Sequence, residues 1–523
     1  YRWYGRLLSR VFGIDPKRPT PAHTKRDGVD YVPAKHWTVL FGHHFSSICG
    51  AGPIVGPALA VAYWGWGPSL IWLLIGAVFM GAVSDFSALV VSVRSEGKSI
   101  PEVARFEISP RARLGFSIFI WLSLVLVIAV FAIFSAKTFV KQPGAIVPSW
   151  GLIPIALLAG WMLYRTRIPA WVSTVVGLGL LVGALSLGSQ VSVGMPSVAG
   201  IDPQSLWIWL LLAYCFIASV IPVNILLQPR DYLASFLLFA CIGIGVISVF
   251  IQQPVMDSVP LYTVNAASAG PIWPMLFVTI ACGAISGFHS LVSSGTTCKQ
   301  LGTEAHACRI GYGGMLLEGL VGVLVVICVG AALTRSELTT TLASGGPIAA
   351  FGQGYGNLSR SILGGYGTVF AVVALNAFLF TTLDTATRIA RYLTTELFGI
   401  RSKYLATALV VGAAGWMALT GQWAKIWPAF GTSNQLIAAL ALLVASCWLL
   451  KRGRPALYTL IPAILMLATT LGAFVYQLAA AVGGMGGKPD WLIAGVVIFL
   501  MVLAVFVSVE AFRIIRNPTT AKE

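Results

Sequence analysis

Residues 42–57 read GHHFSSICGAGPIVGP and lie inside an apolar run that is long enough to cross a bilayer. Gly50 and Gly52 lower helix propensity here, and Pro53 and Pro57 each remove a backbone donor. Backbone that leaves the helix at membrane depth must face protein or a wet cavity, because lipid offers it no hydrogen-bond partner. The stretch therefore predicts a transmembrane helix that is interrupted around a buried ligand.

The composition of the whole chain indicates a polytopic α-helical membrane protein. The chain has 523 residues, of which 57% are hydrophobic and 10% are charged, and its mean hydropathy is +0.85. These values exclude an ordinary soluble globular protein, and the strand alternation of an outer-membrane barrel is absent. The net charge of +16 is interpreted as a topology signal rather than as a nucleic-acid-binding surface. The eight cysteines have no CxxC spacing, so neither a disulfide framework nor a zinc site is indicated.

Apolar runs predict about fourteen spans after a basic N-terminal segment. They cover about residues 37–62, 68–93, 113–140, 150–164, 168–189, 204–228, 233–255, 273–296, 311–333, 363–393, 403–420, 427–450, 457–481 and 491–513. With the N-terminus inside, the large majority of the 34 Lys and Arg residues lie on the inner side, as the positive-inside rule expects. The outer side holds Lys137, Lys141, Arg335, Arg360, Lys425 and Lys488. We therefore expect a multi-pass protein with both termini in the cytoplasm.

The order of the spans predicts two inverted units, residues 37–189 and residues 204–393. Five spans per unit is an odd number, which inverts the second unit relative to the first. Residues 222–229, PVNILLQP, supply breakers in the sixth span that would match those of the first. Interrupted helices at matching positions are typical of transporters that bind substrate at the midplane. The alternative is that these prolines only kink structural helices.

The remaining parts of the chain are predicted to be accessory. They are a basic cytoplasmic segment (residues 1–36), four additional C-terminal helices (residues 403–513) and a cytoplasmic tail (residues 514–523).

The break in the first span suits an anionic substrate. A half-helix that starts after GAGP points its first N–H groups into the cavity, where a carboxylate is stabilised. Polar groups near the proposed breaks and on the eighth span add contacts, although each has a structural alternative as a hydrogen bond between helices. The candidate substrate contacts are Ser46, Ser47, Gly50, Ala51, Gly52, Pro53, Asn224, Gln228, His289 and Ser290.

Ionisable and hydroxyl groups at membrane depth are candidates for ion coupling. Placing a charged side chain there costs free energy, so such residues usually have a function. Asp85 lies too deep for simple snorkelling and either carries a proton or makes a structural hydrogen bond. Histidines near the centre favour proton traffic, since imidazole titrates near neutrality. The candidate coupling residues are His43, His44, Asp85, Asp231, Ser293, Ser294 and Asp384.

Several of these polar groups have competing interpretations. Asp384 is followed by Arg388 on the same helix face, and an ion pair within that helix is favoured. Ser293 and Ser294 either coordinate sodium or hydrogen-bond a neighbouring helix. Glu318, like Lys137 at the outer end of the third span, is either a paired structural charge or a relay member. The GTSNQ run, residues 431–435, is a helix start or a lining patch, and the structural role is favoured.

The strings FGHHFSSICGAGPIVGP, VSDFSALVVSVRSEGKSIPEVAR, IPVNILLQPRDYLASF, PIWPMLFVTIACGAISGFHSLVSSGTTCKQL and FLFTTLDTATRIARY occur in this order between about residues 31 and 400. They resemble the carbon starvation protein A family. The resemblance implies a LeuT-like five-plus-five inverted repeat in the bacterial inner (plasma) membrane. It also implies uptake of pyruvate or small peptides, driven by a proton gradient. The residues that it assigns to the functional core are His43, His44, Gly50, Gly52, Pro53, Asp231, His289 and Ser293.

We therefore expect a secondary active importer rather than an enzyme, with H⁺ as coupling ion and no cofactor or metal. The nearest alternative is a sodium-coupled symporter of a small carboxylate or amino acid. Two alternatives come from other classes. A membrane-embedded metalloenzyme would use His43, His44 and His289, but HExxH and GxSxG are absent. A receptor-like sensor would need an output domain, and no segment outside the membrane is long enough. The expected partners are a small carboxylate or peptide and the lipid bilayer, with no nucleic acid and no obligate protein partner.

Overall fold

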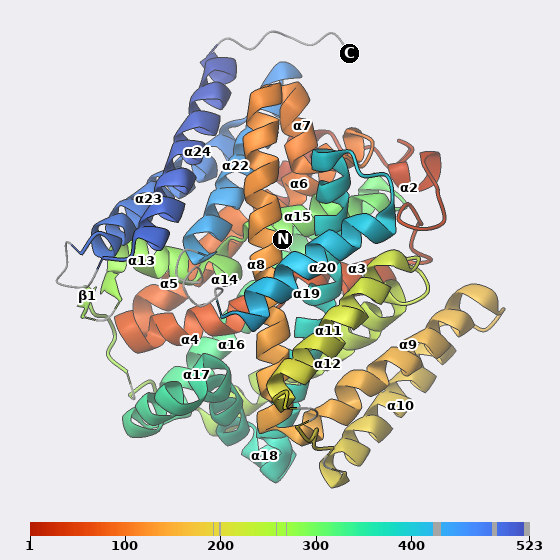
Figure 1. Cartoon of the computed structure of the whole chain (residues 1–523), viewed down its shortest axis with the longest axis vertical. Coiled ribbons are helices and arrows are strands. Elements are labelled where there is room, and N and C mark those ends of the chain that lie inside the picture. Colours follow the sequence, from red (N-terminus) through yellow and green to blue (C-terminus); the bar gives the residue numbers. More distant parts are fainter. Residues whose placement is uncertain are drawn as a thin grey trace.

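The computed structural model describes residues 1–516 except residues 192, 198–199, 258, 268, 422–429 and 484–488. Lys425, Lys488 and Lys522 of the predicted topology lie outside the described residues, as does most of the predicted tail. The described chain is a bundle of helices (Figure 1). Its two-stranded antiparallel sheet pairs Ala266 with Gly270.

Several helices in the first half of the chain start after capping residues. Ser99, Ser109 and Asp202 each accept a hydrogen bond from a backbone N–H of the helix that they precede. The elements are α1 (Tyr4–Phe12), α2 (Pro21–Thr24), α3 (Trp37–Ile48), α4 (Gly52–Trp64), α5 (Trp66–Gly76), η1 (Ala77–Gly81), α6 (Ala82–Arg94), α7 (Ile100–Glu107), α8 (Pro110–Lys141), η2 (Pro143–Ala145), α9 (Ile146–Arg165), α10 (Ala170–Gln190), α11 (Pro203–Val220) and α12 (Leu227–Gln252).

The second half contains several short helical pieces among its long helices. The elements are β1 (Asn265–Ala266), β2 (Gly270–Pro271), α13 (Ile272–Thr279), α14 (Ala281–Ala284), α15 (Gly287–Gly295), η3 (Thr297–Lys299), η4 (Glu304–His306), η5 (Cys308–Tyr312), α16 (Gly313–Ala331), α17 (Arg335–Leu358), α18 (Arg360–Leu363), η6 (Gly364–Tyr366), α19 (Gly367–Phe398), α20 (Lys403–Leu419), α22 (Phe430–Lys451), α23 (Leu457–Ala481) and α24 (Trp491–Arg516).

The first span is interrupted as the sequence predicts. Its halves α3 and α4 are bent by 44° about residues 49–51. Gly52 begins α4 where two segments meet closely, since a Cβ at this position would lie 2.3 Å from the sulfur of Cys282. The close approach of another segment therefore requires glycine at Gly52.

The predicted interruption of the sixth span is wrong. Helix α11 ends at Val220 and α12 begins at Leu227, so PVNILLQP joins two helices instead of interrupting one. Pro222 holds the preceding residue, Ile221, in an extended conformation that ends α11. Pro229 lies in the first turn of α12, where a missing N–H costs little.

The second interrupted helix is instead the predicted eighth span. This segment is divided into α13, α14 and α15, with extended backbone at Ile285 and Ser286. Gly287 lets the start of α15 pack directly on α22, because a Cβ there would lie 2.2 Å from the Cβ of Ile437. The two interrupted helices touch each other, because α4 packs against both α13 and α14.

Eleven described helices are long and apolar enough to cross a membrane, and the bent pair α3 and α4 makes twelve. Of the other two predicted spans, α20 is a shorter apolar helix and the segment from α13 to α15 is divided. The chain is therefore an all-helical multi-pass membrane protein.

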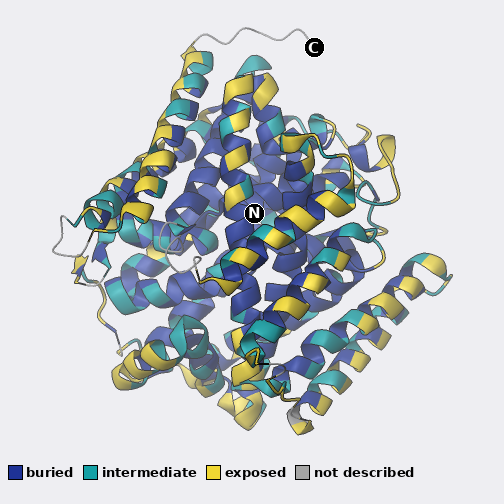
Figure 2. Ribbon diagram, viewed as in Figure 1, coloured by how far each residue is buried: buried dark blue, intermediate teal, exposed yellow. Residues whose placement is uncertain are grey.

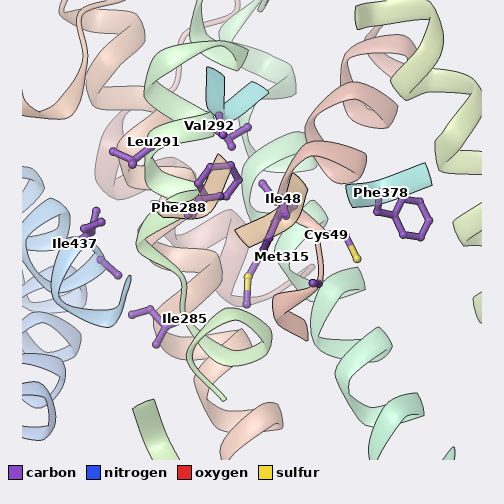
Figure 3. Packing of buried hydrophobic residues seen from close by; sticks show 14 of the residues in the cluster. Ile48, Cys49, Ile285, Phe288, Leu291, Val292, Met315, Phe378 and Ile437 are labelled. Atoms are coloured by element: carbon purple, nitrogen blue, oxygen red, sulfur yellow. The ribbon is translucent and has the colours of Figure 1, made fainter. Parts of the chain in front are cut away.

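The two longest helices, α8 and α19, pack against each other through the centre of the bundle. Around them α3 packs on α12, α4 on α16, and α15 on both α6 and α22. Buried residues concentrate in this centre, whereas α9 and α10 form an outlying pair with exposed faces (Figure 2). Figure 3 shows the apolar packing beside the first break, with Ile48 and Cys49 at the end of α3 and Met315 on α16.

Candidate functional site

A cavity of about 430 Å³ lies at the break between α3 and α4. Segments from both interrupted helices surround it, together with Phe131 of α8 and the start of α22. The residues that line it are Ala51, Gly52, Val55, Gly56, Leu59, Tyr63, Phe131, Met275, Val278, Thr279, Ala281, Cys282, Phe430, Gly431, Thr432, Asn434 and Gln477. The break in the first span therefore opens onto a space of the size used for small ligands.

Two of the four residues of the GAGP break line this cavity, and the other two pack beside it. Ala51 and Gly52 line it directly. Gly50 packs against its wall, since a Cβ there would lie 2.9 Å from Thr382 Oγ1 and 3.0 Å from Phe131. Pro53 is buried in the first turn of α4. In the described chain, no protein group accepts a hydrogen bond from the N–H of Ala51 or Gly52, so these donors remain available.

Asn434 connects the cavity to the second interrupted helix. Its side-chain oxygen accepts a hydrogen bond of 2.9 Å from the N–H of Phe288, in the first turn of α15. Its nitrogen donates to Cys282 Sγ at 3.0 Å and to Ser286 Oγ at 3.1 Å. The GTSNQ run is thus both a helix start and a lining patch, although the sequence interpretation favoured structure alone.

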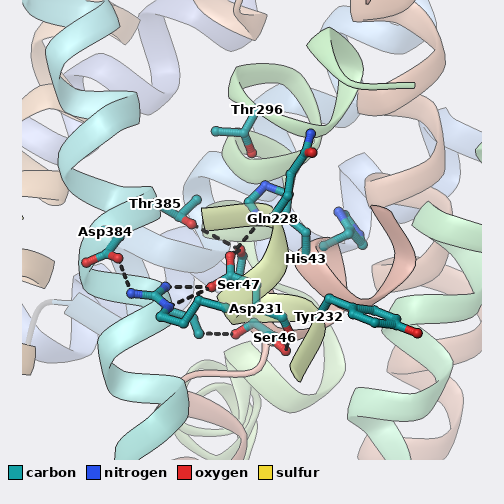
Figure 4. Close-up of polar contacts among 12 residues, drawn as sticks. His43, Ser46, Ser47, Gln228, Asp231, Tyr232, Thr296, Asp384 and Thr385 are labelled. Atoms are coloured by element: carbon teal, nitrogen blue, oxygen red, sulfur yellow. Dashed lines mark hydrogen bonds and ion pairs between the residues drawn. The ribbon is translucent and has the colours of Figure 1, made fainter. Parts of the chain in front are cut away.

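Ser46 and Ser47, two predicted substrate contacts, belong to a buried polar network (Figure 4). Ser46 Oγ donates to the backbone carbonyl of Asp231 at 2.8 Å. Ser47 Oγ lies 3.0 Å from Thr385 Oγ1 and 3.4 Å from an Asp231 carboxylate oxygen. His43 completes this part of the network, with its Nδ1 2.6 Å from the same carboxylate. These groups bind α12 and α19 to α3, and none of them lines the cavity.

Arg230 is the cation at the centre of this network. It pairs with Asp231 at 2.5 Å, and also contacts Asp384 and the hydroxyl of Tyr214. The predicted ion pair between Asp384 and Arg388 is therefore wrong. Helical spacing puts both on one face, but tertiary contacts with other helices bind them separately.

Arg388 instead contacts the segment that precedes α3. Its guanidinium lies 2.6 Å from Asp30 and donates to the carbonyls of Ala218 and Ile221. Arg391 also pairs with Asp30, at 2.9 Å. Burial raises the pKa of Asp30, but Arg388 and Arg391, with a further contribution from Lys299, more than offset this and hold the pKa at about 2.

Residues 28–35 extend this contact into a strap across one face of the bundle. The strap bonds to the α11–α12 connector, where the N–H of Val223 donates to the carbonyl of Val29 at 3.0 Å. It also bonds beside η3, where the N–H of Ala34 donates to the carbonyl of Gln300 at 3.1 Å. Gln228 donates to Gln300 at 2.7 Å and to the carbonyl of Val32, so it holds the strap and does not line the cavity.

Asn224, another predicted substrate contact, lies in the α11–α12 connector and is not among the cavity residues. Ser293 and Ser294 are buried on α15, away from the cavity lining. His44 is buried with its Nδ1 2.9 Å from Thr297 Oγ1. The structure therefore distributes the predicted site residues over several separate polar clusters.

A second cluster of ionisable groups joins α6, α15 and α16. His289 Nδ1 lies 3.1 Å from an Asp85 carboxylate oxygen, and His289 Nε2 lies 3.0 Å from a Glu318 carboxylate oxygen. The first contact has hydrogen-bond geometry, whereas the second is an ion-pair distance without that alignment. Beside them, Ser290 Oγ lies 2.9 Å from Ser84 Oγ. Asp85 and His289 are among the predicted site residues, whereas Glu318 is predicted to be either a paired structural charge or a relay member.

Among the described residues, no three His, Cys, Asp or Glu side chains are arranged to hold a metal ion. The two nitrogens of His289 face carboxylates on opposite sides, so its groups do not converge on a common point. The described residues therefore contain no set of metal ligands of the kind that the metalloenzyme alternative needs.

Comparisons with known proteins identify the family. Residues 1–340 and 331–473 match the family described as Carbon starvation protein CstA. The chain belongs to the CstA family. The peptide transporter CstA of Escherichia coli K12 is 35% identical, with 90% of this chain and 78% of the relative aligned. The pyruvate/proton symporter BtsT of the same organism is 30% identical, with 91% and 80% aligned.

Solved structures of other membrane proteins are similar to this chain in fold. A manganese transporter from Eremococcus coleocola has a TM-score of 0.55 and covers 94% of this chain and 99% of its own, with 14% sequence identity. At this identity the likeness concerns the fold alone. With its relatives named as transporters, this CstA-family chain is a membrane transporter rather than an enzyme.

Proposed function

We propose that this CstA-family chain imports a small carboxylate-bearing substrate, pyruvate or a short peptide, together with a proton. The observation that supports the proposal best is the cavity at the first break, with the N-terminus of α4 at its wall. The N–H groups of Ala51 and Gly52 and the helix dipole favour an anion there, by about 0.3–1 kcal/mol in exposed sites and more when partly buried. The names of the relatives supply the two substrate classes and the proton.

Packing favours a LeuT-like inverted repeat with boundaries other than those expected from span order. The contact of α4 with α16 corresponds to that of α15 with α6, and α3 with α12 corresponds to α14 with α22. In the same way, α8 with α11 corresponds to α19 with α20. We therefore place α3 to α8 with α11 and α12 in one unit, and α13 to α16 with α19, α20 and α22 in the other. Helices α9, α10, α23 and α24 lie outside both units.

Alternating access follows from what lies on either side of the cavity. A second cavity of about 370 Å³ is lined by Lys137, Lys141 and residues 344–347 of α17, and Val55 lines both this cavity and the central one. Away from α17, the strap of residues 28–35 is tied to α19 through the ion pairs of Asp30 with Arg388 and Arg391. We propose that the face with α17 is outside and the strap is cytoplasmic, which agrees with the distribution of Lys and Arg. The substrate then enters past α17 and leaves when the strap opens.

Uptake by the purified protein in liposomes tests the proposal. We expect saturable uptake of labelled pyruvate or alanyl-alanine in sodium-free buffer, accelerated by an alkaline interior. A Gly52→Ala variant should lose uptake, because its Cβ would meet Cys282. Gly183→Ala is the matched control, since no atom lies within 4 Å of a Cβ at that exposed position of α10. If uptake does not depend on the pH gradient and requires sodium, proton symport is contradicted and sodium symport is supported.

A further inference from the structure

We propose that Asp85, His289 and Glu318 together form the site that carries the coupled proton. This inference rests on the proposed proton symport and assigns its proton to particular side chains. The three residues come from α6, α15 and α16, so the cluster joins one half of the second interrupted helix to two neighbouring helices. All three side chains are at most 1% exposed.

Charge balance within the cluster requires an extra proton. With both carboxylates ionised and the imidazole protonated, the cluster has a net charge of −1. One further proton makes it neutral. Because an uncompensated charge is expensive in a dry membrane interior, the closed site favours the neutral, loaded form. Releasing the proton becomes inexpensive only when water reaches the cluster, which is the behaviour that a coupling site needs.

Within the described part of the chain, no permanent cation pairs with the cluster. Among the described residues, the ion pairs of Asp85 and Glu318 are with His289 alone. Of the described side chains, His44 on α3 and Cys49 and Cys282 beside the break also interact electrostatically with the cluster. None of these is a permanent cation that would replace the proton.

The network of Arg230 differs from this cluster. Arg230 is permanently charged and pairs with both Asp231 and Asp384. These two carboxylates therefore remain paired whichever form His43 takes. Removing the extra proton from the His289 cluster instead leaves two carboxylates that share one imidazolium, and no other cation of the described chain pairs with either. The His289 cluster is consequently the better place for a proton that must be bound and released in each cycle.

The cluster is connected to the substrate cavity through the start of α15. Asn434 lines the cavity and accepts the hydrogen bond from the N–H of Phe288, the residue next to His289. The same side chain donates to Cys282, which lines the cavity from α14. A substrate that contacts Asn434 therefore acts on the backbone that positions His289. This gives a short physical route between substrate occupancy and proton affinity.

The test separates proton movement from substrate movement in proteoliposomes of the full chain. One assay follows internal pH with a dye while a pyruvate or alanyl-alanine gradient drives transport. The other measures counterflow, the exchange of labelled for unlabelled substrate, which needs no net proton movement. For Glu318→Gln and Asp85→Asn we expect substrate-driven proton movement to fall to that of empty liposomes, while counterflow persists. Glu318→Asp, which keeps the carboxyl group, should retain part of the proton movement.

The control is Glu96→Gln, which removes an exposed carboxylate paired with Lys25 and should change neither assay. Proton movement that persists in both Glu318→Gln and Asp85→Asn would overturn the inference, and its loss in His43→Gln alone would assign the proton to the other network. Loss of counterflow in Glu318→Gln, Asp85→Asn and Glu318→Asp would also overturn it, since the cluster would then be needed for folding or substrate binding. Absence of proton movement in the wild-type protein would instead contradict the proposed symport itself.

Discussion

Replacing Asp30 with asparagine should loosen the strap that closes the proposed cytoplasmic side. Asp30 is the acidic group that pairs with both Arg388 and Arg391, and its side chain is 12% exposed. Asparagine keeps the shape of the side chain and removes its charge. Both arginines would then lose the ion pair that ties residues 28–35 to α19, while their other contacts remain.

The size of the effect follows from the pKa of Asp30. Burial raises this pKa, but Arg388 and Arg391 bring it from an ordinary 3.8 to about 2. At 1.36 kcal/mol for each pKa unit, the charged carboxylate stabilises the closed strap by about 2 kcal/mol. Because the pKa is lowered, this contribution is complete above about pH 4 and is lost as the pH falls towards 2. The difference between wild type and Asp30→Asn should therefore be constant between about pH 5 and pH 8.

Hydrogen exchange of the full-length protein in detergent measures this opening directly. The amides of Ala34 and Val223 donate across the two sides of the strap, so both exchange when it opens. A loss of about 2 kcal/mol should speed their exchange roughly 30-fold in Asp30→Asn. Amides within α8 and α19 should keep their wild-type rates, because the change is local.

Unchanged exchange at Ala34 and Val223 in Asp30→Asn would refute the reasoning, since the ion pairs would then contribute nothing to closure. Glu96→Gln is the matched control. It removes a carboxylate from the Lys25–Glu96 pair, whose side chains are 43% and 61% exposed. A pair so exposed is expected to contribute little, and exchange of the strap should not change.

Three further predictions test the site. In uptake assays, Gly52→Ala should abolish uptake. The double variant with Cys282→Gly should recover part of it, because the second change removes the sulfur that lies 2.3 Å from the new Cβ. Asp384→Asn should lower the melting temperature measured in detergent, because it leaves Arg230 buried with one carboxylate in place of two. Breaking a buried ion pair costs about 3–5 kcal/mol. An unchanged melting temperature would contradict this prediction. Asn434→Ala should reduce the free energy of unfolding by about 1 kcal/mol, because it removes the hydrogen bond to the first turn of α15. It should also raise the substrate concentration for half-maximal uptake, and wild-type uptake kinetics would exclude Asn434 from the site.

The sequence predicts the first break because its signal is local. Glycines and prolines within residues 50–57 disfavour a helix whatever they contact, and the bend lies among them. The same reasoning failed at PVNILLQP, because prolines also occur at helix ends, where they interrupt nothing. The real second break is in a segment with glycines and no internal proline after Pro274. Its division at Ile285 and Ser286 depends on packing against α22, which the sequence of that segment does not reveal.

The candidate site shows the same division between local and long-range signals. Ala51 and Gly52 line the cavity as expected, but they share it with Asn434 and Gln477, from helices predicted to be accessory. Asp384 was expected to pair with a residue one helical turn away, and it pairs with Arg230 on another helix. Spacing along one helix shows which partners are within reach, but the neighbouring helices decide which of them is used.

The two breaks are best understood as a single feature. Gly52 makes room for Cys282, and Gly56 makes room for the carbonyl of Thr279, since a Cβ at either position would lie about 2.3–2.4 Å from that atom. Gly52 and Gly56 of the first interrupted helix are thus matched to a side chain and a backbone carbonyl of the second. The cavity lies where these close approaches end and the backbone of both segments leaves the helix. A change in the angle between α4 and α14 must therefore alter the cavity and the start of α15 together, and with them the distance from His289 to its carboxylates.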